Sequence, residues 1–527
     1  MKQGMNPFLP LYEYIPDGEP HVFGDRIYLF GSHDREGGRR YCELGNYVLW
    51  SAPLAAPTEW VCHGEIYNAR KDPRYREGEI MDLYAPDVVQ GNDGRFYLYY
   101  NLTDSEHGMN GYCSVAAADR AEGPYEYHGT VRHADGTPYN VYLMGDPAVL
   151  NDDGVIRLYT GWSLSAVAAE AHAQGGGYEG ERRNETAGGQ EASGARQAPQ
   201  MPEPGTPAMA AAIRPALKML FKKTDEELDA LELPLMGANA FELEEDMLTV
   251  RSAPRRIVAG QLDTPKDSSF FGHAFYEASS IRKINGRYYF IYSSENSNEL
   301  CYATSRYPDR DFVYGGTIIS NGDVGYQGLP KEKRNNMTAN DHGSLENING
   351  QWYIFHHRQT HKSTFSRQAC AEKVEILPDG SIPQAECTSM GLNPGPLRAE
   401  GRYSAPYSCV LTNGAMPHAT NTMVNGDFPY ITNEGEERFI TDIKEGTKIG
   451  YKYFDFDGPV KLGITYKSTA AGVMEVWNGK ERLAEIEMKD AEEWTESETE
   501  ISLAGTHPIF LIYRGEGTAR LLEIWFR

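Results

Sequence analysis

Four residues suited to acid–base chemistry recur at nearly the same position of a repeated sequence pattern. The pattern is a turn, usually with a glycine, followed by a short strand rich in aromatic residues. It occurs five times, at 24–32, 93–101, 153–161, 285–293 and 349–357. Asp17, Asp146 and His342 each lie eight positions before the turn of their copy, and Glu277 lies nine before. Because equivalent positions of a repeat occupy equivalent places in space, we expect the four side chains to meet.

Several carboxyl groups in one narrow space raise one another's pKa values, so one can stay protonated while another stays ionised. Cleavage of a glycosidic bond needs that pair: an acid for the leaving oxygen and a base for water. Taken singly, an aspartate beside glycine or proline is more often a turn residue, and a lone histidine is more often structural. The shared register of all four residues favours the functional interpretation.

The repeated pattern also predicts the elements that position these residues. Each copy follows a short apolar stretch and has Asn-Gly or Asp-Gly turn chemistry, which is typical of a β-hairpin. Repeated hairpins of this size indicate propeller blades whose inner strands begin around one axis. We therefore expect an all-β protein in which residues 1–400 form a five-bladed β-propeller.

Two other regions differ in composition from the repeats. An insertion at about 165–236 begins with a stretch rich in Ala, Gly, Gln and Glu, which predicts a flexible loop, and continues at 208–231 with helical spacing. After a Gly/Pro-rich linker, 407–527 shows short alternating strands such as YKYFDF and KLGITYKS. This pattern predicts a second domain, a β-sandwich.

Five stretches resemble glycoside hydrolase family 43, a family of inverting, five-bladed propeller enzymes: NPFLPLYEYIPDGEP, LYAPDVVQGNDGRFYLYY, MGDPAVLNDDG, FYEASSIRKINGRYYFIYSS and DHGSLENINGQWYIFHHR. The resemblance implies that Asp17 is the general base and Glu277 the general acid. It implies that Asp146 tunes the pKa of the acid and orients it. His342 matches a histidine that lies beside a bound calcium in many members, and Arg367 loosely matches an arginine that touches the sugar.

Further residues are candidates for weaker reasons. Glu19 is an alternative base, because the first motif reads Asp-Gly-Glu-Pro where Asp-Pro is the commoner form. Tyr84 and Trp162 are expected to bind substrate, since flat aromatic faces suit a sugar ring, although Trp162 fits the core equally well. The sandwich resembles carbohydrate-binding modules of the family 6 type, with Trp477 or Trp494 as platforms. Packing against the propeller is the alternative, slightly favoured interpretation.

Composition agrees with a hydrolase and argues against other classes of protein. The net charge of −25 makes nucleic acids and anionic membranes poor partners. No stretch approaches the ~18 apolar residues of a membrane span. The sequence MKQGMNPFLP lacks the apolar region of a signal peptide, and the seven cysteines show no Cys-x-x-Cys spacing. A cytoplasmic enzyme with reduced thiols is therefore expected.

The expected function is inverting hydrolysis at the non-reducing end of plant hemicellulose oligosaccharides. An α-L-arabinofuranosidase is favoured, with β-D-xylosidase as the alternative and galactan-type substrates behind both. No cofactor is expected to be required, apart from a structural calcium in the propeller channel. A non-catalytic sugar-binding propeller is a rival, but it would not need three convergent carboxyls. The related retaining fructan hydrolases are disfavoured because no WMNDPNG-like motif occurs.

Overall fold

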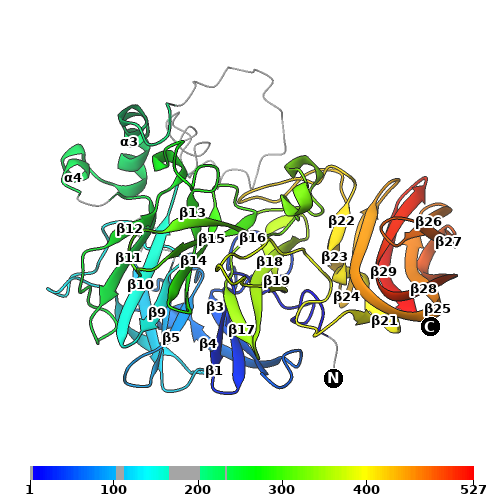
Figure 1. Ribbon diagram of the computed structural model, residues 1–527, viewed down its shortest axis with the longest axis horizontal. Helices are drawn as coiled ribbons and strands as arrows, with labels where there is room; N and C mark the ends of the chain where they lie inside the picture. Colours follow the sequence, from blue (N-terminus) through cyan, green and yellow to red (C-terminus); the bar gives the residue numbers. More distant parts are fainter. Residues whose placement is uncertain (1–3, 103–111, 165–201, 232–233) are drawn as a thin grey trace.

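A computed structural model of the chain describes residues 4–102, 112–164, 202–231 and 234–527. Five sheets are arranged as propeller blades, and a larger sheet region from the C-terminal part of the chain lies beside them (Figure 1). This confirms the predicted all-β fold class. Within the described residues, no helix is long and apolar enough to cross a membrane.

The strands of each blade follow one another in sequence, with antiparallel pairing. The first blade contains β1 (Glu19–Phe23), β2 (Arg26–Phe30), β3 (Asn46–Pro53) and β4 (Val61–Asn68). The second contains β5 (Asp87–Gln90), β6 (Phe96–Asn101), β7 (Cys113–Ala118) and β8 (Glu126–Thr130). The third contains β9 (Ala148–Asp152), β10 (Val155–Trp162), β11 (Gly237–Leu243) and β12 (Arg255–Val258). The fourth contains β13 (Phe275–Ile284), β14 (Arg287–Ser294), β15 (Glu299–Ser305) and β16 (Val313–Ser320). The fifth contains β17 (Leu345–Ile348), β18 (Gln351–Thr360) and β19 (Ser363–Val374).

The predicted hairpins form because the turn residues accept a left-handed backbone. In the turn between β13 and β14, Asn285 has φ of 51° and Gly286 has φ of 75°. Such values at both central residues are the signature of the tight turn that matches strand twist. Between blades, the aromatic and aliphatic side chains of facing sheets form buried clusters, so each blade is stabilised by its two neighbours.

The inner strands surround the propeller axis. β1 contacts β5 and β17, and β9 contacts β5 and β13. A parallel bridge between Gly18 and Gly343 joins the first blade to the last. Gly343 is required there, since a Cβ atom would lie 1.9 Å from the carbonyl oxygen of Phe355. The ring therefore closes immediately beside Asp17 and His342.

The insertion within the third blade contains two helices, α3 (Pro207–Phe221) and α4 (Asp225–Asp229). Thr206 caps α3 and Thr224 caps α4, in each case by accepting a backbone N–H of the first turn. The apolar face of α3, which includes Met209, Ile213 and Leu220, packs into the hydrophobic cluster between the second and third blades. The flexible loop expected before the helices falls on residues 165–201, which are not among the described residues.

The C-terminal region combines short strands with two long ones. Its members are β20 (Leu397–Arg398), β21 (Gly401–Ser404), β22 (Val410–Thr412), β23 (Tyr430–Glu434), β24 (Glu437–Ile443), β25 (Lys448–Ser468), β26 (Gly472–Trp477), β27 (Arg482–Met488), β28 (Ala491–Gly515) and β29 (Ala519–Phe526). The expectation of separate strands at YKYFDF and KLGITYKS is wrong. Both belong to β25, which continues through Gly458 because β28 pairs with it on both sides of that residue.

Short 3-10 helices complete the described chain. They are η1 (Ala69–Lys71), η2 (Gln261–Asp263), η3 (Tyr326–Gly328), η4 (Lys331–Lys333) and η5 (Ala405–Tyr407). All seven cysteines fall within described residues and are unpaired.

Candidate active site

The predicted acid–base residues come together at one end of the propeller axis. Asp17 lies two residues before β1, Asp146 two before β9 and His342 three before β17, while Glu277 is the third residue of β13. All of these elements are inner strands, so their beginnings converge at the axis. The four residues therefore form one cluster, which we call the axial site, although they span more than 300 residues of sequence.

Uncommon backbone conformations orient the carboxyl groups of the axial site. Asp17 has φ of 56° and Asp146 has φ of 42°, values that are uncommon outside glycine. At Glu277 the pairing of β13 with β14 is interrupted, and the next residue, Ala278, has φ of 67°. The Ala278 amide donates to Oδ2 of Asp146 at 2.8 Å. This bulge links the third and fourth blades and places Glu277 beside Asp146.

Asp17 is held in its ionised form by a buried arginine. Nη1 of Arg367 donates to Oδ1 of Asp17 at 2.7 Å, and both side chains are almost fully buried. Burial raises the pKa of Asp17, but the nearby Arg367 guanidinium is the largest opposing cause, and that pKa lies below its ordinary value. An ionised carboxylate is what a general base requires.

His357 fixes the backbone of Asp17. The Asp17 amide donates to Nδ1 of His357 at 3.3 Å, and Nε2 of His357 donates to the carbonyl of Asn340 at 2.9 Å. Burial and the nearby Arg367 lower the pKa of His357 to about 4. His357 is therefore neutral, with one nitrogen donating and the other accepting.

Arg367 is itself fixed by a second carboxylate. Its Nε and Nη2 atoms donate to the two oxygens of Asp34 at 2.8 and 3.0 Å. The ring of Tyr41 stacks on the guanidinium, 4.7 Å from its centroid. The described contacts of Arg367 thus serve to hold Asp17, and its direct contact with sugar stays a prediction.

Glu277 has the opposite electrostatic environment. Burial, followed by the negative charges of Asp146 and Asp17, raises the pKa of Glu277 to about 8. Burial and Asp17 also raise the pKa of Asp146, against the opposing effect of His342. Glu277 is therefore protonated near neutral pH and can act as an acid.

The predicted sugar-binding aromatic residues belong to neighbouring blades. Trp162 ends β10 and is half-buried, with its ring 6.5 Å from that of Tyr276, the residue before Glu277. Tyr84 is half-buried and precedes β5, and its carbonyl accepts the hydroxyl of Tyr47. Sugar contact by either residue stays a prediction.

The alternative base, Glu19, lies further along the axis. Its Oε2 atom accepts hydrogen bonds from Ser280 at 3.2 Å and from Arg282 at 3.1 Å. Burial and the neighbouring Asp87 raise the pKa of Glu19 to about 7. Asp17, beside Glu277 and Asp146, is the better base.

The expected calcium at His342 finds few oxygen ligands. Nδ1 of His342 lies 3.8 Å from Oδ1 of Asp17, which Arg367 already binds. Among the described residues, ligand atoms close enough to share a metal gather in two places, and neither includes His342. Since calcium prefers six to eight oxygen ligands, these side chains do not form a calcium cage by themselves. No step below depends on one.

Sequence reasoning missed three residues of this site: Asp34, His357 and Asn340. From the sequence, a loop role suits Asp34 as well as contact with substrate does. The adjacent pair His356-His357 indicated no role in the site. The side chain of Asn340 hydrogen-bonds Glu277. The available signal was position, because His357 is the last residue of the fifth copy and Asp34 lies two residues after the first copy.

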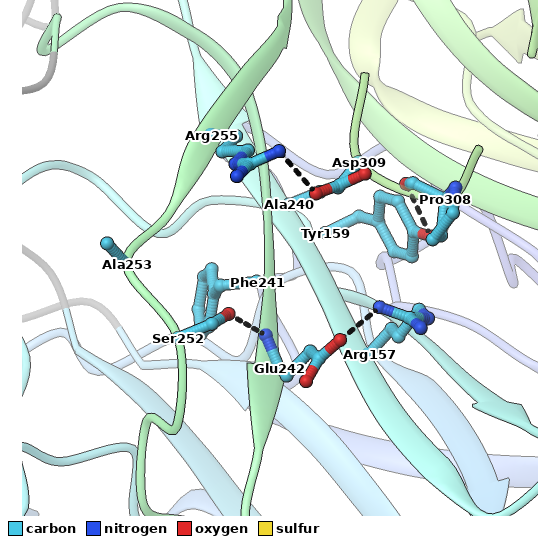
Figure 2. Close-up of a pocket in the computed structure, with 10 residues that line it drawn as sticks. All are labelled: Arg157, Tyr159, Ala240, Phe241, Glu242, Ser252, Ala253, Arg255, Pro308 and Asp309. Carbon is cyan, nitrogen blue, oxygen red and sulfur yellow. Dashed lines mark hydrogen bonds and ion pairs between the residues drawn. The ribbon is translucent and has the colours of Figure 1, made fainter.

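A cavity of about 270 Å³ lies elsewhere, between the third and fourth blades (Figure 2). Its charged side chains pair with one another: Arg157 with Glu242 at 2.7 Å, and Arg255 with Asp309 at 3.0 Å. None of the axial carboxyls lines it. Because its two carboxylates are each paired with an arginine, the cavity offers no acid–base pair and is distinct from the axial site.

Comparison with known proteins agrees with this geometry. No family model matches the chain. A xylosidase/arabinosidase of Thermoclostridium stercorarium is 39% identical over 537 residues, covering 99% of this chain and 98% of that enzyme. Xylosidase/arabinosidase 43A of Humicola insolens is 27% identical over 357 residues, covering 65% of this chain and 88% of its own. A solved structure, a glycoside hydrolase family 43 arabinoxylan arabinofuranohydrolase from Bacillus subtilis, aligns over 98% of this chain and 97% of its own, with a TM-score of 0.46 and 20% identity.

The match to the Thermoclostridium enzyme extends over nearly the whole of both chains. It therefore includes every element that builds the axial site. On this evidence the chain belongs to the xylosidase/arabinosidase enzymes of glycoside hydrolase family 43.

Proposed function

We propose that the protein is an inverting exo-glycosidase that removes terminal arabinofuranosyl or xylosyl residues from xylan and arabinan oligosaccharides. The single observation that carries the proposal is the pair of neighbouring carboxyls with opposite pKa shifts at one site. Glu277 is held protonated and Asp17 is held ionised. This is the division of labour that glycosidic cleavage requires.

In the proposed reaction, Glu277 gives its proton to the glycosidic oxygen as the bond from that oxygen to the anomeric carbon breaks. Asp17 takes a proton from a water molecule, whose oxygen bonds to the same carbon from the opposite face. The configuration is inverted, and both carboxyls return to their starting states after proton exchange with solvent. Asp146 keeps the pKa of Glu277 high by its charge.

Inversion implies a carboxyl separation of ~6.5–9.5 Å between Asp17 and Glu277, because a water molecule must fit beside the base. Proton NMR of the first-formed sugar tests it. Product with the anomeric configuration opposite to that of the substrate is expected. Product with retained configuration would overturn the assignment of Asp17 as a base.

For substrate, we favour the α-L-arabinofuranosidase activity with β-D-xylosidase activity as the second. Both are supported by the names of the relatives, which combine the two activities. Parallel assays on nitrophenyl α-L-arabinofuranoside and β-D-xyloside, followed by arabino- and xylo-oligosaccharides, decide between them. A clear preference for xylobiose reverses the order, and cleavage of neither sugar favours galactan-type substrates.

For the C-terminal region, we propose packing against the propeller ahead of sugar binding as a family 6-type module. Arg358 of β18 donates to the carbonyls of Pro406 and Ser408 at 2.6 and 2.9 Å. The buried Lys452 of β25 pairs with Glu386 at 3.0 Å. These contacts support a fixed interface. Xylo-oligosaccharide binding that is lost on substitution of Trp477 or Trp494, with catalysis intact, would favour the module instead.

A further inference from the structure

A second polar cluster lies further along the propeller axis than the axial site. Glu19 and His21 are two residues apart on β1, so their side chains share one face, and Asp87 begins the neighbouring inner strand β5. One carboxylate oxygen of each acid and one imidazole nitrogen all lie within 4.8 Å of one another. We call these three residues the deep cluster.

The deep cluster contains an acceptor that the protein does not satisfy. Glu19 is 1% exposed, and its Oε1 atom has no hydrogen-bond partner among the described residues. The other oxygen, Oε2, already accepts from Ser280 and Arg282. A buried carboxylate oxygen without a donor costs free energy, so a ligand that binds it is favoured.

The remaining two members contact each other directly. Nε2 of His21 lies 2.6 Å from Oδ1 of Asp87. The Val88 and Val149 amides donate to Oδ1 and Oδ2 of Asp87, each at 2.7 Å, and fix that carboxylate. Because each carboxylate oxygen has two lone pairs, Asp87 keeps acceptor capacity after these contacts.

Charge also favours a cation in this cluster. Two buried carboxylates face a single permanent cation, Arg282, whose Nη2 atom contacts Glu19 at 3.1 Å. The formal charges of the two carboxylates and the guanidinium leave one excess negative charge. A divalent ion would offset that charge and bind the free oxygen of Glu19.

We propose that Glu19, His21 and Asp87 bind a divalent transition-metal ion, Zn²⁺ or Mn²⁺. One imidazole nitrogen with two carboxylate oxygens is a donor set typical of these ions, whereas calcium prefers oxygen alone. The site is distinct from His342, because none of its ligands belongs to the axial site. The ion would join β1 of the first blade to β5 of the second, so it would stabilise the propeller.

The other group of possible ligands in the described residues is His273, Glu299 and Cys301. There, Glu299 already accepts hydrogen bonds from Ser294 at 2.5 Å, Asn296 at 2.9 Å and Thr317 at 2.9 Å. Its carboxylate therefore lacks the free oxygen that distinguishes Glu19. This group provides a matched control.

The test uses the full-length protein, stripped with chelator and titrated calorimetrically with ZnCl₂, MnCl₂ or CaCl₂. We expect one Zn²⁺ or Mn²⁺ per chain and a rise in the thermal midpoint, since an ion that binds only the folded state stabilises it. Glu19→Gln and His21→Asn should weaken binding by more than the ~10–100-fold that loss of an outer-shell partner costs. His273→Asn and His342→Asn should keep the stoichiometry.

Three results would overturn the proposal. The first is a wild-type protein that neither retains Zn²⁺ or Mn²⁺ nor gains thermal stability from it, which would leave the cluster as a hydrogen-bonded ion pair. The second is equal affinity in wild type and both deep-cluster variants. The third is loss of the ion in His273→Asn or His342→Asn. The wild-type titration decides the matter even if a deep-cluster variant fails to fold.

Discussion

The two sides of the axial site differ most in charge, although Asp17 is buried whereas Glu277 and Asp146 are half-buried. On one side, Asp17 contacts the buried guanidinium of Arg367 at 2.7 Å. On the other, Glu277 lies beside Asp146, whose Oδ2 atom accepts the Ala278 amide. Burial raises the pKa of both carboxyls, yet only Glu277 ends above its ordinary value.

Since burial raises both pKa values, the nearby charges set the two values apart and, in the proposed mechanism, assign the roles of base and acid. A cation beside Asp17 opposes the cost of burying its charge, and an anion beside Glu277 adds to that cost. The propeller makes the asymmetry possible because each side comes from different blades. Five experiments test this difference between Asp17 and Glu277.

The largest effect is expected from Glu277→Gln, which removes the proton donor. Activity on an unactivated oligosaccharide should fall by ~10²–10⁴-fold, the usual contribution of a general acid. Nitrophenyl glycosides should lose much less, because their leaving group needs no proton. The ratio of kcat/KM for the two substrate types measures this. The control is Glu19→Gln, which changes a buried carboxyl outside the axial site and should keep the wild-type ratio. An unchanged ratio in Glu277→Gln would contradict the acid role.

Asp17→Asn should cost a similar ~10²–10⁴-fold, because the amide cannot accept a proton from water. The loss should be nearly equal for oligosaccharides and nitrophenyl glycosides, since the base acts on water and not on the leaving group. Steady-state kinetics on both substrates provide the readout. A loss confined to poor leaving groups would exchange the roles of Asp17 and Glu277.

Arg367→Met should raise the pKa of Asp17 by removing its cation. The acid limb of the profile of kcat/KM against pH, where activity is lost as the base becomes protonated, should move up by ~1–3 pH units. Arg367→Lys keeps the charge and should restore part of the shift. If the acid limb stays in place in Arg367→Met, the arginine does not set the pKa of the base.

Asp146→Asn should lower the pKa of Glu277, because it removes the neighbouring negative charge that, after burial, contributes most to raising that pKa. Glu277 works protonated, so activity falls as pH rises through its pKa. The alkaline limb should therefore move to lower pH, by on the order of one unit. An alkaline limb that does not move would mean that burial alone raises the pKa of Glu277.

The smallest effect is on stability. The folded pKa of Glu277, about 8, is above its ordinary value of 4.5, so ionisation opposes folding as pH rises between these values. Glu277→Gln lacks this penalty. Its thermal midpoint should exceed that of wild type by an amount that grows from pH 5 to pH 8. A constant difference across that range would contradict the raised pKa.

The sequence predicted the propeller and the convergence of Asp17, Asp146 and Glu277, because period and register are local properties that a repeat makes visible. It did not predict the role of Arg367 as the partner of Asp17 and Asp34. That role depends on distances between residues some 350 positions apart, which no local pattern encodes. Asp87, which the sequence did not single out as a site residue, begins β5 and is fully buried.

The positive φ angles at Asp17 and Ala278 were equally invisible in the sequence. Neither residue type demands a left-handed backbone, so only tertiary contacts impose it. The long strands β25 and β28 illustrate the same limit, since pairing between them carries each strand through residues that resemble a turn. Local chemistry thus predicted the elements, and contacts between blades determined how the site is charged.

The most direct test of the central claim is the titration of Glu277 itself. Protein labelled with ¹³C at the glutamate carboxyl can be followed by NMR from pH 4 to pH 10, with Glu277→Gln identifying the resonance by its disappearance. We expect one carboxyl resonance, absent in the variant, to titrate with a pKa of about 8. Titration of that resonance at the ordinary value of 4.5 would contradict the account, because both carboxyls would then be ionised when the enzyme works.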